Sequence, residues 1–406
     1  MRPPDQKKVH RRRVFYIPGY DPIHPRRYRE LYRKESAAQA EVSKYSIDLS
    51  AKKRSSGGPY GWQVVSVQEG DNVRADFEVL VWSDIVRDSM EKGIFGTYMQ
   101  LVRTAIAYIG SGVLWRLMRL RKGPVIAALY PVCFLLIQLV ISVLFAWILG
   151  SIFALFGPWW LGFFGLGAVY PVLRWFQKHD GRFFAYYLMH DYAYSAASNG
   201  ENSIALEARM SEFKERIGTA LQEEYDEVLV VGHSSGAHLG VSILSDLIRE
   251  GRCQQTGPSL GFLSLGQVVP MVSFLPEAQR LRADLAFLCQ RQELTWVDVT
   301  APGDGCAFAL CDPVSVSGVA PSQGKRWPLV VSAAFTKTLS EARWAELRWR
   351  FFRLHFQYLC AFDRPGDYDY FRITAGPLTL EERYHGRKPS KSRIETPVSK
   401  YTSVTS

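Results

Sequence analysis

The feature that most constrains this chain is a long stretch without a formal charge. Residues 123–173 contain no Asp, Glu, Lys or Arg, a run of 51 positions. A bilayer core about 30 Å thick is crossed by roughly 20 apolar residues in a helix, so the run is long enough for two spans and a turn. We therefore expect a membrane hairpin with a first span over 125–149, a turn within 150–160, and a second span that ends near residue 173.

The charge distribution indicates how such a hairpin would be oriented. The net charge is +10, and the basic residues form clusters at 7–13, 26–34, 52–54, 116–122 and 174–182. Two clusters flank the hairpin, so the positive-inside rule predicts an integral protein of the inner or plasma membrane with its soluble part and both termini in the cytoplasm. The bilayer is thus an expected partner, and nucleic acid is not, because orientation and lipid headgroups account for the basic clusters.

Other sequence features narrow the possible classes of protein and site. The apolar stretch 104–114 is too short to span and fits a helix at the membrane surface. The six cysteines show no C-x-x-C or metal-ligand spacing, which predicts reduced thiols and neither a metal nor a cofactor. The basic N-terminus leads into a strand-like segment, so no secretory signal is expected. Two spans without an internal charge offer no pathway for a channel or transporter.

The soluble parts of the chain alternate between strand and helix patterns. Strands are predicted at 13–17, 62–67, 77–82, 227–231, 261–265 and 294–300, with a last strand at 328–335 or 347–352, and helices at 25–45, 203–221, 235–249 and 276–289. This alternation predicts the α/β class, with a mostly parallel sheet covered by helices on both faces.

The same patterns divide the chain into five segments. We expect a basic tail at 1–12, a first part of the soluble domain at 13–100, a membrane region with an interfacial helix and two transmembrane helices at 101–182, a second part of the soluble domain at 183–380, and a polar, disordered tail at 381–406.

One motif within this pattern carries a specific chemistry. Gly232-His-Ser-Ser-Gly236 matches G-x-S-x-G, in which a serine occupies a strained turn between a strand and a helix. A second match, around Ser259, precedes a strand and lacks that context. Ser234 is therefore the candidate nucleophile, and the N–H of Ser235, at the start of a helix, is a candidate donor to an oxyanion.

With VVGHSSGA as its most specific segment, the chain resembles α/β-hydrolase-fold serine hydrolases of the esterase and lipase type, with a membrane hairpin inserted before the nucleophile strand. The resemblance implies that YIPGYDP (residues 16–22) is the oxyanion loop, with Pro18 where the family usually has histidine and the Tyr20 N–H as second donor. An ordinary Pro-Gly turn would explain the same residues. The chain starts almost directly at this strand, which suggests that the family's first two strands are missing or replaced.

A serine nucleophile needs a histidine base and a carboxylate, and the family order is Ser, acid, His. His355 is the candidate base, because His238 follows the serine on the same helix, His385 lies in the basic tail and His190 lies upstream in a structural or lid position. Asp304, in the loop after the strand at 294–300, is the favoured acid. Asp312 is its rival, and Asp298, inside that strand, is expected to be structural.

These residues predict a membrane-anchored serine hydrolase that cleaves an ester or thioester, such as an acyl ester or another lipid-like molecule, through an acyl-enzyme on Ser234 with no cofactor. An acyltransferase on the same elbow, or an inactive scaffold that keeps the fold, are the alternatives. Chain length of the acyl group and the oligomeric state do not follow from the sequence.

Overall fold

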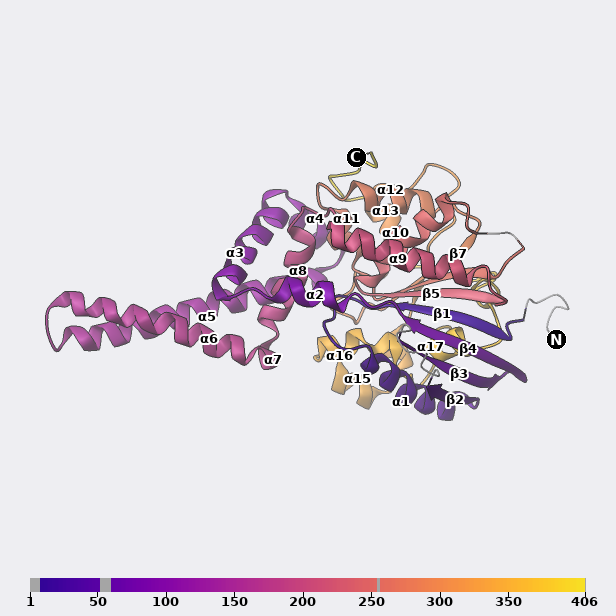
Figure 1. The fold of residues 1–406 in the computed structure, drawn as a ribbon, viewed down its shortest axis with the longest axis horizontal. Coiled ribbons are helices and arrows are strands. Elements are labelled where there is room, and N and C mark those ends of the chain that lie inside the picture. The colour runs from indigo at the N-terminus through magenta and orange to yellow at the C-terminus, as the bar shows by residue number, and fades with distance from the viewer. Residues whose placement is uncertain (1–7, 52–59, 254–255, 406) are drawn as a thin grey trace.

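An eight-stranded mixed sheet forms the centre of the protein (Figure 1). The computed structural model describes residues 8–51, 60–253 and 256–405. The strands are β1 (Arg11–Ile17), β2 (Ser46–Ala51), β3 (Gly61–Gln68), β4 (Asp71–Val79), β5 (Glu227–His233), β6 (Ser259–Leu265), β7 (Leu294–Thr300) and β8 (Leu329–Ser332). They lie in the order β2-β3-β4-β1-β5-β6-β7-β8. The β2-β3 and β3-β4 pairs are antiparallel, and the other neighbours are parallel.

Helices surround this sheet and also extend away from it. Up to the end of the projecting segment they are α1 (Arg26–Ser43), α2 (Ser83–Met90), α3 (Ile94–Ala105), the π-helix η1 (Ile106–Gly110), α4 (Val113–Leu120), α5 (Lys122–Ala154), the 3-10 helix η2 (Trp159–Ala168) and α6 (Val169–Lys178). They continue with α7 (Asp180–Phe183), α8 (Ala185–Ala196), α9 (Ile204–Ala220), α10 (Gly236–Arg249), α11 (Val269–Ser273), α12 (Gln279–Leu288) and α13 (Pro313–Val316). The last are α14 (Phe335–Thr338), α15 (Glu341–Leu347), α16 (Phe351–His355), the 3-10 helix η3 (Gln357–Leu359), α17 (Tyr370–Ala375) and α18 (Leu380–Arg383).

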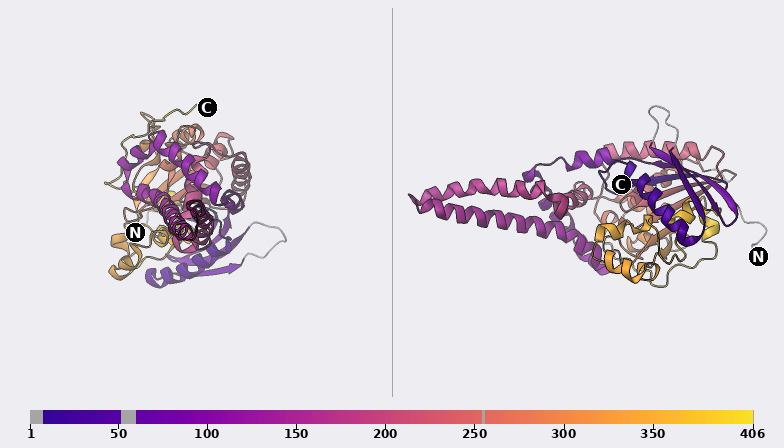
Figure 2. Two further views of the ribbon diagram at one scale, coloured as in Figure 1. Left: turned by 90° about the vertical axis from the view of Figure 1, so that its left-hand side faces the viewer. Right: turned by 90° about the horizontal axis from the view of Figure 1, so that it is seen from below.

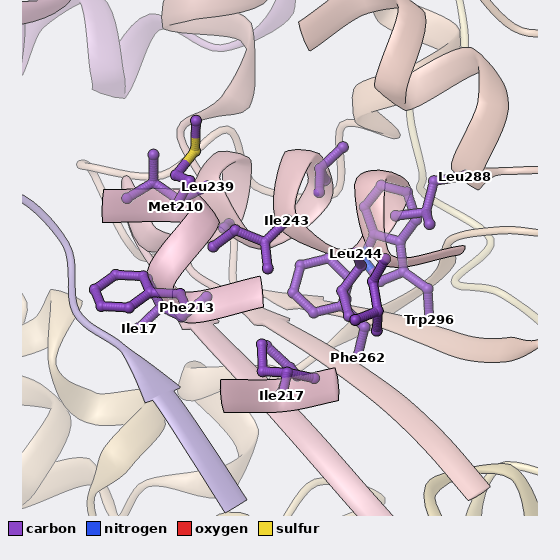
Figure 3. Packing of buried hydrophobic residues seen from close by; sticks show 14 of the residues in the cluster. Ile17, Met210, Phe213, Ile217, Leu239, Ile243, Leu244, Phe262, Leu288 and Trp296 are labelled. Carbon is purple, nitrogen blue, oxygen red and sulfur yellow. The ribbon is translucent and has the colours of Figure 1, made fainter. Parts of the chain in front are cut away.

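Both faces of the sheet are buried because successive side chains of a strand point to opposite sides. On β5, Val228 and Val230 pack with α9, α10 and α12, whereas Leu229 and Val231 belong to the cluster on the other face with α1 and α17. Figure 3 shows the first of these cores, where side chains of α9 and α10 meet Phe262 and Trp296 from β6 and β7. The predicted α/β class with helices on both faces is therefore confirmed.

Most predicted elements are present, and the structure adds others. β2 was not predicted, because its half-exposed SIDLSA pattern is short and polar. The last strand is the 329–332 segment, and residues 347–352, the other candidate, lie at helix ends. β2 and β3 form the edge of the sheet beyond β4. Both strands follow β1 in the sequence, and among the described residues no strand precedes β1.

The charge-free run forms an extension that projects from the body (Figures 1 and 2). α5 leads outward, the chain reverses after Ala154, and η2 and α6 return beside it. The reversal falls within the predicted turn at 150–160. Among the described residues, α5 is the one helix long and apolar enough to cross a membrane, whereas the predicted second span is divided between η2 and α6.

Glycines let the two limbs of this extension approach at backbone distance. A Cβ atom added to Gly165 would lie 2.2 Å from the carbonyl oxygen of Ala146, and one added to Gly150 would lie 2.4 Å from that of Gly162. Large side chains on the same limbs point outward, and Trp147 and Phe164 are 69% and 65% exposed. The extension is thus closely packed inside and apolar outside.

Between the sheet and the extension lies a group of helices with a second exposed apolar surface. The predicted surface helix at 104–114 is distributed over the end of α3, η1 and the start of α4. Its inner side is buried at Tyr108 and Leu114, while Ile106 and Ile109 are exposed. The segment is therefore amphipathic, although it is not one continuous helix.

Both chain ends differ from the tails expected from their composition. Residues 1–7 and the basic cluster 52–54 lie outside the described residues. Arg12 is buried, and its Nε donates to Glu227 at 2.5 Å, so part of the N-terminal basic cluster belongs to β1. Residues 381–405, expected to be disordered, run along the body. Ile394 pairs with Cys311, and the carbonyl oxygen of Ser403 accepts a hydrogen bond from buried Arg282. Hydrogen bonds from this segment's backbone to the body hold it in place. Amino-acid composition alone does not reveal such bonds.

Candidate active site

Ser234 occupies a sharp turn between β5 and α10. Its φ angle is 56°, in the left-handed region that a non-glycine residue enters only when its surroundings impose it. The Ser234 N–H donates to the carbonyl oxygen of Leu265 at 2.9 Å, which holds the turn against β6. A Cβ atom at Gly236 would lie 2.2 Å from the carbonyl oxygen of Ile17, so only glycine lets α10 begin this close to β1. The motif therefore has the strand, turn and helix expected of it.

The loop after β1 meets this turn. A Cβ atom at Gly19 would lie 2.9 Å from the Cβ and 3.4 Å from the Oγ of Ser234, so the backbone of the predicted oxyanion loop is in contact with the serine. The neighbouring Tyr20 is held on both sides. Its carbonyl oxygen accepts a hydrogen bond from the Tyr187 hydroxyl at 2.6 Å, and its own hydroxyl pairs with Ser89.

The structure brings His355 and Asp304 together. The Nδ1 atom of His355 lies 2.7 Å from Oδ2 of Asp304, and both side chains are buried. His355 is the last residue of α16, well beyond the end of β8 at Ser332, so a helix and not the loop directly after the last strand delivers it. Because a carboxylate only accepts hydrogen bonds, the Nδ1 atom carries the proton and Nε2 is left to act as an acceptor.

Asp304 is held by three donors. Besides His355, the Tyr358 hydroxyl lies 3.0 Å from Oδ2, and the Cys306 N–H lies 2.9 Å from Oδ1. Burial alone would raise the pKa of Asp304, but the His355 charge and these hydrogen bonds lower it below its usual value. Burial raises the pKa of Tyr358, which therefore stays a donor. The sequence alone did not identify Tyr358 as part of the site. The one signal available for it was its position three residues after His355.

His233, the motif residue before the serine, holds the histidine from the other side. Its Nε2 lies 3.0 Å from the carbonyl oxygen of His355 and must donate, because a carbonyl oxygen only accepts. Burial, together with the charge of His355, lowers the pKa of His233 to about 3. A neutral ring on β5 thus anchors the backbone of α16 next to Ser234, a role that the sequence motif did not reveal.

Ser234, Ser235, Tyr20 and His355 line one cavity that is open to solvent. The elbow, the loop after β1, α8 and α16 contribute to its wall. Pro124 at the root of α5 lines it as well, so the cavity lies where the projecting extension joins the body. Asp304 lies behind His355, outside the lining.

The rival candidates occupy structural positions. Asp312 accepts hydrogen bonds from the N–H groups of Val314 and Ser315 at the start of α13 and pairs with Lys325, away from His355. Asp298 is buried in β7, as expected of a structural residue, and accepts a hydrogen bond from Ser264 at 2.6 Å.

The other histidines weighed as the base and the second motif are also separate from the cavity. His238 is buried in α10, and His190 pairs with Gln100, linking α8 to α3. His385 is exposed. Ser259 is the first residue of β6, opposite Glu227 at the start of β5, and so lies at the other end of the parallel strands from Ser234.

One set of potential metal donors overlaps the site. Ligand atoms of Asp304, Cys306 and His355 lie within 4.8 Å of one another. A zinc-type site would need a thiolate. Burial raises the pKa of Cys306 well above its usual value, with the nearby carboxylates adding to the effect, so its sulfur is a thiol while no metal is bound. Oδ2 of Asp304 and Nδ1 of His355 are already hydrogen-bonded to each other. This set of side chains therefore fits an oriented histidine better than a metal site.

Comparison of the chain with protein-family models, curated proteins and solved structures finds no match.

Proposed function

We propose that this protein is a membrane-anchored serine hydrolase of the α/β-hydrolase type that cleaves an ester or thioester through an acyl-enzyme on Ser234. One observation carries the proposal. A serine in a strained elbow lines the same cavity as a histidine whose Nδ1 is bound to a buried carboxylate. The three residues follow one another as serine, acid and histidine, the chain order of that family.

Each group has a definite task in this mechanism. His355, oriented by Asp304, takes the proton of Ser234 through Nε2 while Oγ attacks the substrate carbonyl carbon, and then returns it to the leaving group. A water molecule resolves the acyl-enzyme by the same route. The N–H groups of Ser235 and Tyr20 are the proposed oxyanion donors. Ser235 precedes α10, whose N-terminus favours negative charge, and Gly19 brings the other loop against the serine.

Among the bonds within the described residues, the His355 ring bonds to Asp304 and none joins it to Ser234. Hydrogen bonds between a base and its nucleophile are commonly long without substrate and shorten in the complex. Both residues line one cavity, and His233 anchors the backbone of α16 beside it, so we propose that side-chain movement on substrate binding completes the arrangement.

The projecting extension supports a membrane location and a lipid-like substrate. Its outward-facing apolar residues have no cover in the protein, and glycine contacts between its limbs resemble the packing of membrane helices. We propose that α5 and the η2-α6 limb form a membrane hairpin. The basic residues at both ends of the hairpin support a cytoplasmic location for the soluble part. Since Pro124 lines the cavity, an acyl chain would reach Ser234 from the bilayer surface.

Labelling by a fluorophosphonate probe tests the chemistry. The wild-type protein in detergent micelles should be labelled on Ser234, and Ser234→Ala should abolish labelling with an unchanged unfolding transition. Ser259→Ala is the matched control, because Ser259 occupies the second G-x-S-x-G match and should leave labelling intact. A wild-type protein that neither reacts nor cleaves acyl esters would be an inactive scaffold.

A further inference from the structure

α8 presents an unpaired carboxylate to the cavity that holds Ser234. Tyr187, Asp191 and Ser195 are four residues apart and line the cavity together with Leu188 and Tyr192, so one side of the helix faces it. Within the described parts of the chain, the Asp191 carboxylate accepts no hydrogen bond and forms no ion pair. The proposed mechanism does not use it.

Apart from the proposed base His355, whose charge acts on Asp191, the described cavity wall surrounds this carboxylate with aromatic rings and no counter-charge. Although the chain has a net charge of +10, none of the described residues that line the cavity is Lys or Arg. The aromatic lining residues are Tyr20, Tyr108, Tyr187, Tyr192, Phe352 and Phe356. The other lining carboxylate, Asp21, already accepts hydrogen bonds from the Tyr28 hydroxyl and the Ile23 N–H.

Carboxylates next to aromatic faces attract organic cations, because the ring quadrupole and the negative charge both favour a weakly hydrated ammonium group. Asp191 is only partly exposed, and an unpaired carboxylate with little access to water is costly unless a ligand compensates its charge. We propose that Asp191 and the surrounding tyrosines recognise a cationic group, an alkylammonium or quaternary ammonium, on the ester that Ser234 attacks. This inference rests on the proposed function and assigns its substrate class.

The titration of Asp191 gives the inference a second readout. Burial raises its pKa to about 7, while the His355 charge opposes this rise. The other titratable groups facing it are Tyr187 and Tyr192 on α8, Tyr108 on η1, Tyr20 after β1, and Cys306. Burial raises the pKa of each of these five, so they stay neutral between pH 6 and pH 8. Asp191 becomes ionised as pH rises through this range, so attraction for a cation should increase with pH.

A pair of matched esters tests the proposal on the full-length protein in micelles. A choline ester and the 3,3-dimethylbutyl ester of the same fatty acid have the same shape and differ in charge. For the wild type we expect kcat/KM to favour the choline ester by about tenfold or more at pH 8 and by less at pH 6. Any ionisation that affects only the chemical step acts on both esters alike and cancels in the ratio.

Variants of α8 locate the effect. Asp191→Asn keeps the side-chain shape and should reduce the choline preference by about tenfold and abolish its pH dependence. Ser195→Ala, which removes a polar group from the same helix face without changing charge, should keep the preference. If Asp191→Asn does not fold, the wild type still provides a test, since tetramethylammonium should inhibit it more strongly than neutral tert-butanol does.

The experiments distinguish failure of the cation site from failure of the proposed hydrolase function. Equal kcat/KM values for the two esters, with cleavage and probe labelling still dependent on Ser234, would overturn the cation site and leave the hydrolase proposal standing. Absence of cleavage and labelling altogether would remove both. A preference that persists in Asp191→Asn would also overturn the assignment to Asp191.

Discussion

Replacing Asp304 by asparagine tests the proposed orientation of His355. In the wild type, Oδ1 accepts the Cys306 N–H, and Oδ2 accepts both His355 and Tyr358. If the asparagine oxygen keeps the Cys306 bond, its NH₂ group faces Nδ1 of His355 and donates to it. The ring proton then moves to Nε2, which can no longer accept the proton of Ser234.

The opposite amide orientation is unfavourable. It would restore the bond from His355 but place two donors, the NH₂ group and the Cys306 N–H, against each other in a buried site, at a cost of about 1–3 kcal/mol. The variant should therefore fold with His355 in the inactive tautomer. In serine hydrolases the wrong histidine tautomer lowers kcat by about 10⁴, equivalent to about 5.5 kcal/mol in the activation barrier.

The assay is kcat for a p-nitrophenyl acyl ester in micelles, together with the rate of fluorophosphonate labelling. Asp312→Asn is the matched control. Asparagine still caps α13, and the loss of the largely buried pair with Lys325 should lower stability by about 3 kcal/mol and leave kcat within about threefold of the wild type. The reasoning is refuted if Asp304→Asn retains more than a tenth of the wild-type kcat, or if Asp312→Asn loses as much.

Two further predictions concern stability. Burial raises the pKa of Asp298 to about 8, so between pH 5 and pH 8 the folded state keeps a proton that the unfolded chain has released, and wild-type stability falls as pH rises. Thermal unfolding should therefore show Asp298→Asn gaining a few kcal/mol relative to the wild type from pH 5 to pH 8; a constant difference would contradict this. Gly165→Val should force the limbs of the extension apart and lower the unfolding temperature in micelles by several degrees. Gly167→Val, where an added Cβ meets nothing within 4 Å, should not, and equal effects would disprove the contact.

Sequence patterns were sufficient to locate a strand or helix where neighbouring residues determine it. Alternation of side chains located β7 at its observed limits, and the apolar spacing of residues 203–221 located α9 within one residue at each end. β2 was missed because its polar sequence pairs with β3 through backbone hydrogen bonds that require no particular side chains. The order of residues 381–405 depends in the same way on backbone bonds to the body, such as that from the Ile394 N–H to the carbonyl oxygen of Leu310.

By itself, the sequence determined where a charge-free, membrane-compatible segment interrupts an α/β chain, and that a serine follows a buried strand at a helix start. Both are properties of neighbouring residues. Only the tertiary structure decided that His355 meets Asp304 and not Asp312, and that Asp191 faces the same cavity as Ser234. Distances between side chains from separate elements depend on how the helices pack on the sheet, and no local pattern records that packing.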